Sequence, residues 1–295
     1  MNGFSFNRFG KTLRWVLAVN FRTLLMWTVG ASLGVFLGEM LLLKINSLDE
    51  PSVMINTFSN FGSMLLVIVT LIFISSIVAT INDKRKRETF LMLPSTTLEK
   101  FLSLLLYTTV INTLCVFLAM VIGDSLRMGW LAVSSGNGYS YSADGDTWYW
   151  WSSTIPQLVK NLTSPFYFVD GSIYKYTLGY RMMQAVVTIG FGFWIHSLYT
   201  LGGTLLRKYA FVATSVVMIL CFLLFGKLVM TFELSMFTSE WIDDHYVSQE
   251  VGAAAYVLGI VLPLFSILNY WASFQIFKGF QLITNKWMNY DILKR

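Results

Sequence analysis

GSMLLVIVTLIFISSIVATI (residues 62–81) followed by NDKRKRETFLMLPSTTLEKF (residues 82–101) is the stretch that decides the fold. The first part is an apolar run of about 20 residues, the length that a helix needs to cross a bilayer. The second part has four adjacent cations at residues 84–87, the apolar letters FLML at residues 90–93, and then Pro94. A second apolar run follows at residues 101–122. Two apolar runs joined by a short basic loop predict two membrane spans with the loop in the cytosol.

The composition of the whole chain agrees with a membrane protein. Of the 295 residues, 55% are hydrophobic and 13% are charged, whereas a soluble domain has about 25% charged residues. The net charge of +5 is small, and its Lys and Arg residues are not clustered with aromatic residues on one soluble face. We therefore expect no nucleic-acid partner.

Six segments of the chain have the length and apolarity of a span: residues 23–43, 62–81, 101–122, 182–203, 209–230 and 251–277. The last contains Pro263, which predicts a kink. We expect a single all-α transmembrane domain over residues 1–295, with one large external loop at residues 128–180. The aromatic cluster WYWW at residues 148–151 within that loop is typical of a membrane–water boundary.

The Lys and Arg residues orient these spans. Most of the chain's 21 basic residues fall in the N-terminal segment, in the loop between spans two and three, in the loop between spans four and five, and after span six. Because basic residues favour the cytosolic side, this distribution predicts that both termini are cytosolic. We expect a multi-pass protein of a bacterial cytoplasmic membrane.

The segment before span one has a basic amphipathic pattern. Over residues 4–20, Phe9 and Leu13 alternate with Lys11 and Arg14 at roughly helical spacing. Such a pattern favours a helix lying in the membrane interface, which we call the elbow helix. The alternative is a frayed cytosolic tail.

The loop at residues 83–100 carries the functional hypothesis. Thr96 and Glu99 fit a capping box, which predicts that a helix starts there. Phe90, Leu91 and Leu93 form an apolar patch in a basic loop, and exposed apolar patches mark binding surfaces. We expect a partner to bury this patch, with polar contacts at its edge from the residues Arg87 and Glu88. The alternative is a basic loop that only fixes the topology.

This organisation resembles the permease subunit of type-2 ATP-binding-cassette (ABC) exporters. That family has six spans, an elbow helix before span one and a coupling helix between spans two and three. The matching residues in this sequence are Arg87-Glu88-Thr89, the run from Phe90 to Leu93, Pro94-Ser95 and Glu99-Lys100-Phe101. The Gly-Thr pair that usually follows the acidic residue in the family is absent, because Thr89 and Phe90 occupy those positions.

The resemblance implies the partners and the chemistry. An ABC ATPase subunit would dock on the coupling helix and bind the ATP and Mg²⁺, so the chain itself would hold no cofactor. A second permease subunit, either a copy of this chain or a paralogue, would complete the transporter in the lipid bilayer. The substrate would be apolar or amphipathic and would move outward, since no charged pore lining is evident.

The sequence lacks an ATP-hydrolysing site of its own. Gly10-Lys11-Thr12 resembles the end of a phosphate loop, but Ser5 stands where the first glycine is required. We therefore expect a chain that is not an enzyme. Cys115 and Cys221 lie in apolar segments and are expected to be buried thiols.

A few polar residues lie inside or near the spans. Glu39, Asp124, Arg127 and Lys227 fall near the outer ends of their spans, and we expect them to reach the interface by extending their side chains. His196 lies deeper in span four, where a hydrogen bond between helices is favoured over proton transfer.

Two other functions stay open at this point. One is a six-span sensor or assembly protein that uses the basic loop for a regulatory partner and transports nothing. The other is a membrane enzyme acting on lipid, for which Glu39, Asp124 and Glu233 are weak candidates.

Overall fold

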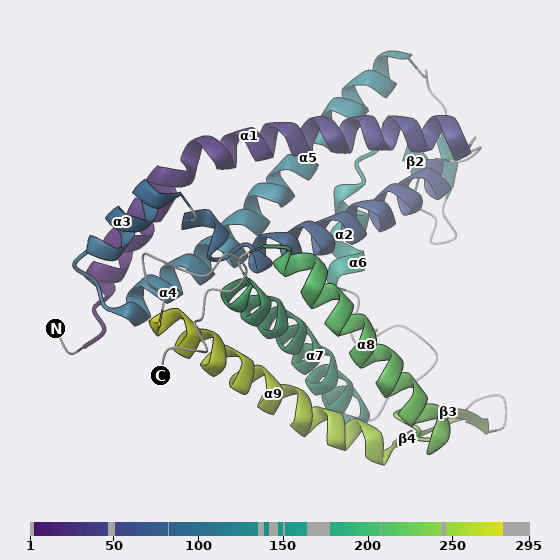
Figure 1. Cartoon of the computed structure of the whole chain (residues 1–295). Helices are drawn as coiled ribbons and strands as arrows, with labels where there is room; N and C mark the ends of the chain where they lie inside the picture. Colours follow the sequence, from purple (N-terminus) through teal and green to yellow (C-terminus); the bar gives the residue numbers. More distant parts are fainter. Residues whose placement is uncertain are drawn as a thin grey trace. The chain divides into compact units, whose positions relative to one another are not determined.

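The computed structural model describes residues 3–46, 51–81, 83–134, 139–141, 147–149, 151–163, 178–206, 208–242 and 246–279. Within these residues the chain is predominantly helical, and six helices are long and apolar enough to cross a membrane. The prediction of an all-α polytopic protein is therefore confirmed (Figure 1). By its internal packing the chain divides into two units, one within residues 1–12, 74–105 and 165–295, the other within residues 13–73 and 106–164.

The first unit contains three long helices joined in sequence. They are α7 (Leu178–Leu205), α8 (Ala210–Thr231) and α9 (Ala253–Lys278). The helix α7 packs along α9 and also contacts α8 (Figure 1). Close packing at the end of α7 requires glycine, because a Cβ on Gly203 would lie 2.5 Å from the Ser75 carbonyl oxygen.

An antiparallel hairpin that we did not predict connects α8 to α9. The strands β3 (Phe237–Ile242) and β4 (Tyr246–Val251) pair from Phe237 opposite Val251 to Ile242 opposite Tyr246. The expected sixth span, residues 251–277, therefore starts two residues later at Ala253. Pro263 lies inside α9 without ending it.

The remaining elements of the first unit are short. A 3-10 turn, η1 (Ala79–Ile81), precedes α3 (Lys84–Met92), and α4 (Thr97–Leu106) follows after a break. The expected coupling helix within residues 83–100 is thus a helix in the structure. The apolar run at residues 62–81 is α-helical only as far as Ser75, and the 3-10 turn η1 forms its end.

The second unit is built on helices that extend beyond the predicted spans. The helix α1 (Phe6–Asn46) has 41 residues. The helix α2 (Pro51–Ser75) begins eleven residues before the predicted position 62. Its first residue is proline, which is favourable there because the first N–H groups of a helix have no partner within it. The third span consists of α4, a π-helical turn η2 (Tyr107–Ile111) and α5 (Asn112–Ser134). Residues 128–134, which were expected to belong to the external loop, are therefore the last turns of α5.

The elbow and span one were expected as separate helices, and the structure joins them. No proline and no adjacent pair of glycines occurs between Phe6 and Thr23, so nothing in the local sequence stops helical hydrogen bonding. The elbow, residues 4–20, is thus largely the first part of α1.

The second unit has two small apolar cores. The larger is formed by Val35, Leu66, Val116, Met120 and Leu158. The smaller is formed by Met54, Ile55, Phe58 and Leu131. Leu158 comes from the helix α6 (Ile155–Thr163), which therefore contributes to the larger apolar core. A short hairpin of β1 (Tyr139–Tyr141) and β2 (Thr147–Tyr149) precedes α6.

Candidate partner-docking site

The helix α3 has defined ends. The Asp83 backbone is extended (φ −62°, ψ 130°), and its carboxylate accepts a hydrogen bond from the Arg85 N–H at 3.4 Å. Aspartate is a favourable residue at this position because it satisfies an amide that has no partner within the helix. At the other end the Leu93 N–H donates to the Phe90 carbonyl oxygen at 3.3 Å. Pro94 then has no N–H with which to continue the helix.

The predicted capping box at the start of α4 is present. The Glu99 N–H donates to the Thr96 hydroxyl oxygen at 3.3 Å. In return the Thr96 N–H donates to Oε2 of Glu99 at 2.9 Å. These reciprocal bonds satisfy two amides at the helix start.

The Glu99 carboxylate also binds the start of α1. It accepts a hydrogen bond from the Ser5 N–H at 2.8 Å and another from Nη2 of Arg8 at 2.9 Å. Nε of Arg8 lies 3.3 Å from both carboxylate oxygens. The Glu99 side chain is fully buried by these groups. One carboxylate thus joins the N-terminal segment of the chain to the start of α4.

A lysine joins α4 to α3. Nζ of Lys100 donates to the Leu91 carbonyl oxygen at 2.8 Å and lies 6.0 Å from the centre of the Phe90 ring. This carbonyl is in the last turn of α3, where helices leave their C=O groups without partners. We call α3, α4 and the first turns of α1 the α1–α3–α4 assembly.

The assembly places the predicted docking residues differently from our expectation. Phe90 and Arg87 are buried within the chain, so neither projects as a free docking side chain. Glu88, Leu91 and Leu93 are half-buried. Phe90 and Arg87 lie three positions apart on α3 and share a face, and this face packs inward. Whether the loop docks a partner stays a prediction.

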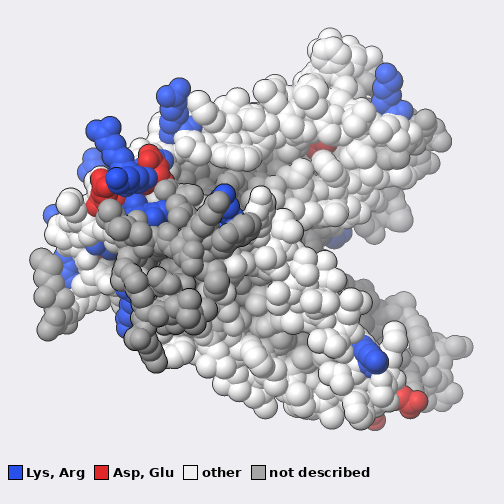
Figure 2. Space-filling model, viewed as in Figure 1, with Lys and Arg blue, Asp and Glu red and all other residues white. Residues whose placement is uncertain are grey.

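The exposed apolar side chain of α3 is Met92, which is 83% exposed. Arg85, Glu88 and Thr89 lie seven, four and three positions before Met92, so they share a face of the helix with it. We call the face formed by these four residues the α3 outer face. In Figure 2, Lys, Arg, Asp and Glu side chains gather over this region, whereas the long helices are almost entirely white.

The predicted elbow residues have mixed exposure. Lys11 and Arg14 are exposed, and Phe9 and Leu13 are half-buried. Phe9 packs against Phe4 with their ring centres 5.8 Å apart. This alternation is the one expected for an amphipathic helix, and its position in the membrane interface stays a prediction.

Three charged residues that we expected at the membrane surface are buried together in the second unit. Nε of Arg127 lies 3.1 Å from Oε2 of Glu39, and Nη2 of Arg127 lies 2.6 Å from Oδ1 of Asp124. Their side chains are at most 5% exposed, and the Phe58 ring centre lies 5.4 Å from Cζ of Arg127. The expected extension to the interface is therefore wrong for all three, because each finds an oppositely charged partner inside the protein. We call Glu39, Asp124 and Arg127 the buried charge cluster.

The buried charge cluster holds the segment that leads into α6. Asp124 accepts hydrogen bonds from the Ser153 hydroxyl at 2.6 Å and from the Thr154 hydroxyl at 2.9 Å. Nη2 of Arg127 donates to the Ser152 carbonyl oxygen at 2.7 Å. The cluster therefore positions residues 152–154 on α5.

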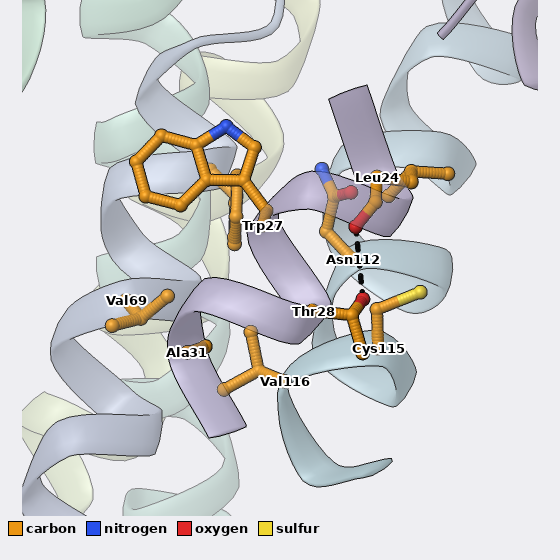
Figure 3. Close-up of a pocket in the computed structure, with 9 residues that line it drawn as sticks. Leu24, Trp27, Thr28, Ala31, Val69, Asn112, Cys115 and Val116 are labelled. Atoms are coloured by element: carbon orange, nitrogen blue, oxygen red, sulfur yellow. Dashed lines mark hydrogen bonds between the residues drawn. The ribbon is translucent and has the colours of Figure 1, made fainter. Parts of the chain in front are cut away.

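A small cavity adjoins the π-helical turn of span three (Figure 3). Its volume of about 20 Å³ suffices for one water molecule. Asn112 lines it and is buried, and Oδ1 of Asn112 has no hydrogen-bond partner among the described residues. The Thr28 hydroxyl, also at the cavity, donates to the Leu24 carbonyl oxygen at 2.9 Å (Figure 3). A π-helical turn with a buried amide is a common feature of functional positions in helices.

His196 makes the expected bond between helices. Its Nδ1 lies 2.5 Å from the Tyr270 hydroxyl oxygen, which joins α7 to α9. One residue further along α7, the Ser197 hydroxyl oxygen accepts a hydrogen bond from Nδ2 of Asn269 at 3.1 Å. Among the described residues no group of three or more His, Cys, Asp and Glu side chains could hold a metal ion.

Sequence reasoning did not find Ser5 and Arg8 as partners of Glu99, nor Arg127 as the partner of Glu39. The only local signal was the spacing of Asp124 and Arg127, because residues three apart on a helix are neighbours. The other pairs are far apart in the sequence, where no periodicity connects them.

Comparisons with protein-family models, with curated proteins and with solved structures find no match for this chain.

Proposed function

We propose that the chain is the membrane-spanning subunit of an ABC exporter of the type-2 class, driven by a separate ATPase subunit. It would work as a pair, with a copy of itself or a paralogue, in a bacterial cytoplasmic membrane. Its substrate would be apolar or amphipathic and would move outward. The observation that carries the proposal is the α1–α3–α4 assembly.

The assembly has the connections that a coupling device needs. A push on α3 reaches the third span directly, because Lys100 of α4 binds the Leu91 carbonyl oxygen. It reaches the first span as well, because Glu99 binds Ser5 and Arg8. Each contact is charge-assisted, and such hydrogen bonds are roughly twice as strong as neutral ones.

The docking contact assigned to the partner is the α3 outer face. Met92 offers a flexible apolar side chain that adapts to a groove, and Arg85 and Glu88 flank it with opposite charges. Burying a side chain of this size contributes about 1.5–3 kcal/mol. The flanking charges would set the orientation and the rate of association more than the affinity.

The test compares two methionines of equal exposure. Met92→Asp removes the proposed apolar contact, and Met230→Asp makes the same change at the far end of α8, where the side chain is also 83% exposed. Tagged chains are purified from membranes of the native cell, and the copurified protein is identified and assayed for ATP hydrolysis. We expect an ATPase with the wild type and with Met230→Asp, and about a tenfold or greater loss with Met92→Asp.

Two results would contradict the proposal. One is a copurified partner without ATPase activity, which would favour the sensor or assembly protein. The other is an ATPase retained equally by both variants, which would remove the docking role from α3. Phe90→Asp is unsuitable for this test, because a charge at a fully buried position disrupts the fold itself.

A further inference from the structure

The buried charge cluster contains two carboxyl groups but only one guanidinium. Its three side chains are at most 5% exposed, so solvent does not screen the excess negative charge. Two carboxylates that share a buried site repel each other, and one nearby cation does not fully offset the free energy of ionising both. The cluster therefore lacks one positive charge.

Asp124 has the hydrogen-bond donors that an ionised carboxylate needs. Its oxygens accept bonds from the Ser153 and Thr154 hydroxyls at 2.6 and 2.9 Å and from the Thr154 N–H at 3.2 Å. Nη2 of Arg127 donates to the same carboxylate at 2.6 Å. Because such bonds stabilise the charged form of a carboxyl group, Asp124 is the better place for the negative charge.

Glu39 lacks such donors. Its Oε2 is buried and accepts no hydrogen bond from the part of the chain that the structure describes. Nε of Arg127 lies 3.1 Å from this oxygen, but its N–H donates to Oδ1 of Asp124, 3.3 Å away. A buried oxygen without a donor costs more free energy on an ionised carboxylate than on a neutral carboxyl group. Glu39 is therefore the place where the missing charge is needed.

The neighbouring elements do not supply this charge. Helix α2, which contributes Phe58 to the cluster, has no ionisable side chain, and α5 contributes only one more, Cys115 in its first turn. Lys44 of α1 and Lys160 of α6 are exposed, and no ion pair joins either of them to Glu39 within the described residues. The other cations of α1 lie in the first half of that helix.

A proton fits this place better than a metal cation. Ca²⁺ and Mg²⁺ each take about six or more oxygen ligands, whereas among the residues that the structure describes no group of three or more His, Cys, Asp and Glu side chains could hold a metal ion. The Asp124 oxygens already accept hydrogen bonds. A proton needs a single oxygen, and Oε2 of Glu39 is one without a donor.

We propose that Glu39 is a proton-binding site and that its proton controls how firmly residues 152–154 are held on α5. With the proton bound, the guanidinium of Arg127 stays with Asp124 and with the Ser152 carbonyl oxygen, to which Nη2 donates at 2.7 Å. Without the proton, Glu39 competes with both for the N–H groups of Arg127, so the segment is held less firmly. The site needs no ATPase partner and is therefore independent of the proposed function.

The test measures the proton and the segment separately, with the full chain in lipid nanodiscs. Infrared spectroscopy detects the C=O band of a protonated carboxyl group. Hydrogen exchange followed by mass spectrometry reports on the Thr154 N–H, which donates to Asp124. Glu39→Gln introduces a neutral side chain with the shape of the protonated glutamate. Glu250→Gln is the matched change at an exposed glutamate.

We expect the carboxyl band in mildly acidic buffer, in which exposed glutamates are ionised, for the wild type and Glu250→Gln but not for Glu39→Gln. In that buffer the Thr154 N–H should exchange equally in the wild type and Glu39→Gln. In alkaline buffer it should exchange several-fold faster in the wild type, because only the wild type can lose the proton. Comparing the two proteins at the same pH cancels the intrinsic dependence of exchange on pH.

Three results overturn the proposal. A spectrum in which Glu39→Gln removes no carboxyl band would show that Glu39 is ionised. Fast exchange at Thr154 in Glu39→Gln, together with slow exchange in Asp124→Asn, would assign the proton to Asp124. Exchange in the wild type that depends on the concentration of Na⁺ or Mg²⁺, and not on pH relative to Glu39→Gln, would assign the missing charge to a metal cation.

Discussion

Glu99 and Asp124 each bind groups from a second segment of the chain. Single carboxylates thus join segments that are far apart in the sequence. Glu99 joins α4 to Ser5 and Arg8, and Asp124 joins α5 to the segment before α6. Burying a carboxylate costs free energy unless hydrogen-bond donors surround it. Each of these two residues therefore favours the one arrangement of the chain in which its donors are in place. The capping role of Glu99 was predictable because its partner Thr96 is three residues away. The role of Arg8 was not, because that pairing depends on the fold.

We predict that Glu99→Ala releases the start of α1. Ser5 and Arg8 lose their acceptor, and Thr96 loses half of its capping box, so trypsin should cleave at Arg8 and Lys11 several-fold faster than in the wild type. Arg8→Ala, in which Lys11 is the site compared, should have a smaller effect, because Ser5 and Thr96 keep their bonds to Glu99. Limited proteolysis followed by mass spectrometry measures the cleavage rates. Equal rates in the wild type and Glu99→Ala would show that the contact does not hold the segment.

We predict that Arg127→Leu destabilises the protein by about 3–5 kcal/mol, because it leaves two buried carboxylates without their cation. Lys227→Leu is the matched control, since Lys227 is exposed and its replacement should change stability by no more than about 0.5 kcal/mol. Unfolding in mixed detergent micelles, followed by tryptophan fluorescence, measures both. Similar free energies of unfolding for the two variants would mean that the buried charge cluster adds no stability.

At the scale of elements, the existence of the six spans was predictable and their ends were not. Hydropathy identifies the apolar part of a helix, but α1, α2 and α5 continue into polar sequence because nothing there prevents helical hydrogen bonding. The π-helical turn at residues 107–111 has no signal in its sequence, YTTVI. The hairpin of β3 and β4 was also missed, since two short strands in a loop produce no clear alternation.

Helix packing in the second unit depends on glycine at one position. A Cβ on Gly123 of α5 would lie 2.8 Å from both the Ser32 carbonyl oxygen and Cβ of Val35. Because backbone cannot move aside as a flexible side chain can, we predict that Gly123→Ala costs about 1–3 kcal/mol. Gly129→Ala, on the same helix with nothing within 4 Å, should be neutral or stabilise by up to about 1 kcal/mol. Thermal unfolding of the two variants compares them, and a neutral Gly123→Ala would contradict the close approach of α1 and α5.

At the scale of the whole molecule, the exposed surface of the long helices is apolar. Val216, Leu223 and Leu224 of α8 are all about half exposed or more, which in water would cause aggregation but suits lipid. Composition alone predicted this result, because the number of charged residues is too small to cover a soluble protein. Docking of a partner on the α3 outer face depends on the surfaces of both chains, so the sequence of one chain can only suggest it.

We predict the topology from the distribution of basic residues. With Cys115 and Cys221 replaced by alanine, Lys84→Cys on α3 should react with an impermeant thiol reagent only after the cells are opened. Lys160→Cys on α6 should react in intact cells. Both positions are exposed on the protein, so access to solvent is not limiting. Labelling of the cysteine at position 84 from outside would invert the orientation.

The contact between Ser5 and Glu99 also sets an order of events during synthesis. The two residues are 94 positions apart, and a ribosome adds about 5–20 residues per second. The N-terminal segment therefore waits roughly 5–20 s for its acceptor to be made. During that interval span one is synthesised while Ser5 and Arg8 have no carboxylate to bind. Joining of the elbow to α4 thus follows the synthesis of span one, and a nascent chain stalled before Glu99 would keep its basic N-terminal helix without this contact.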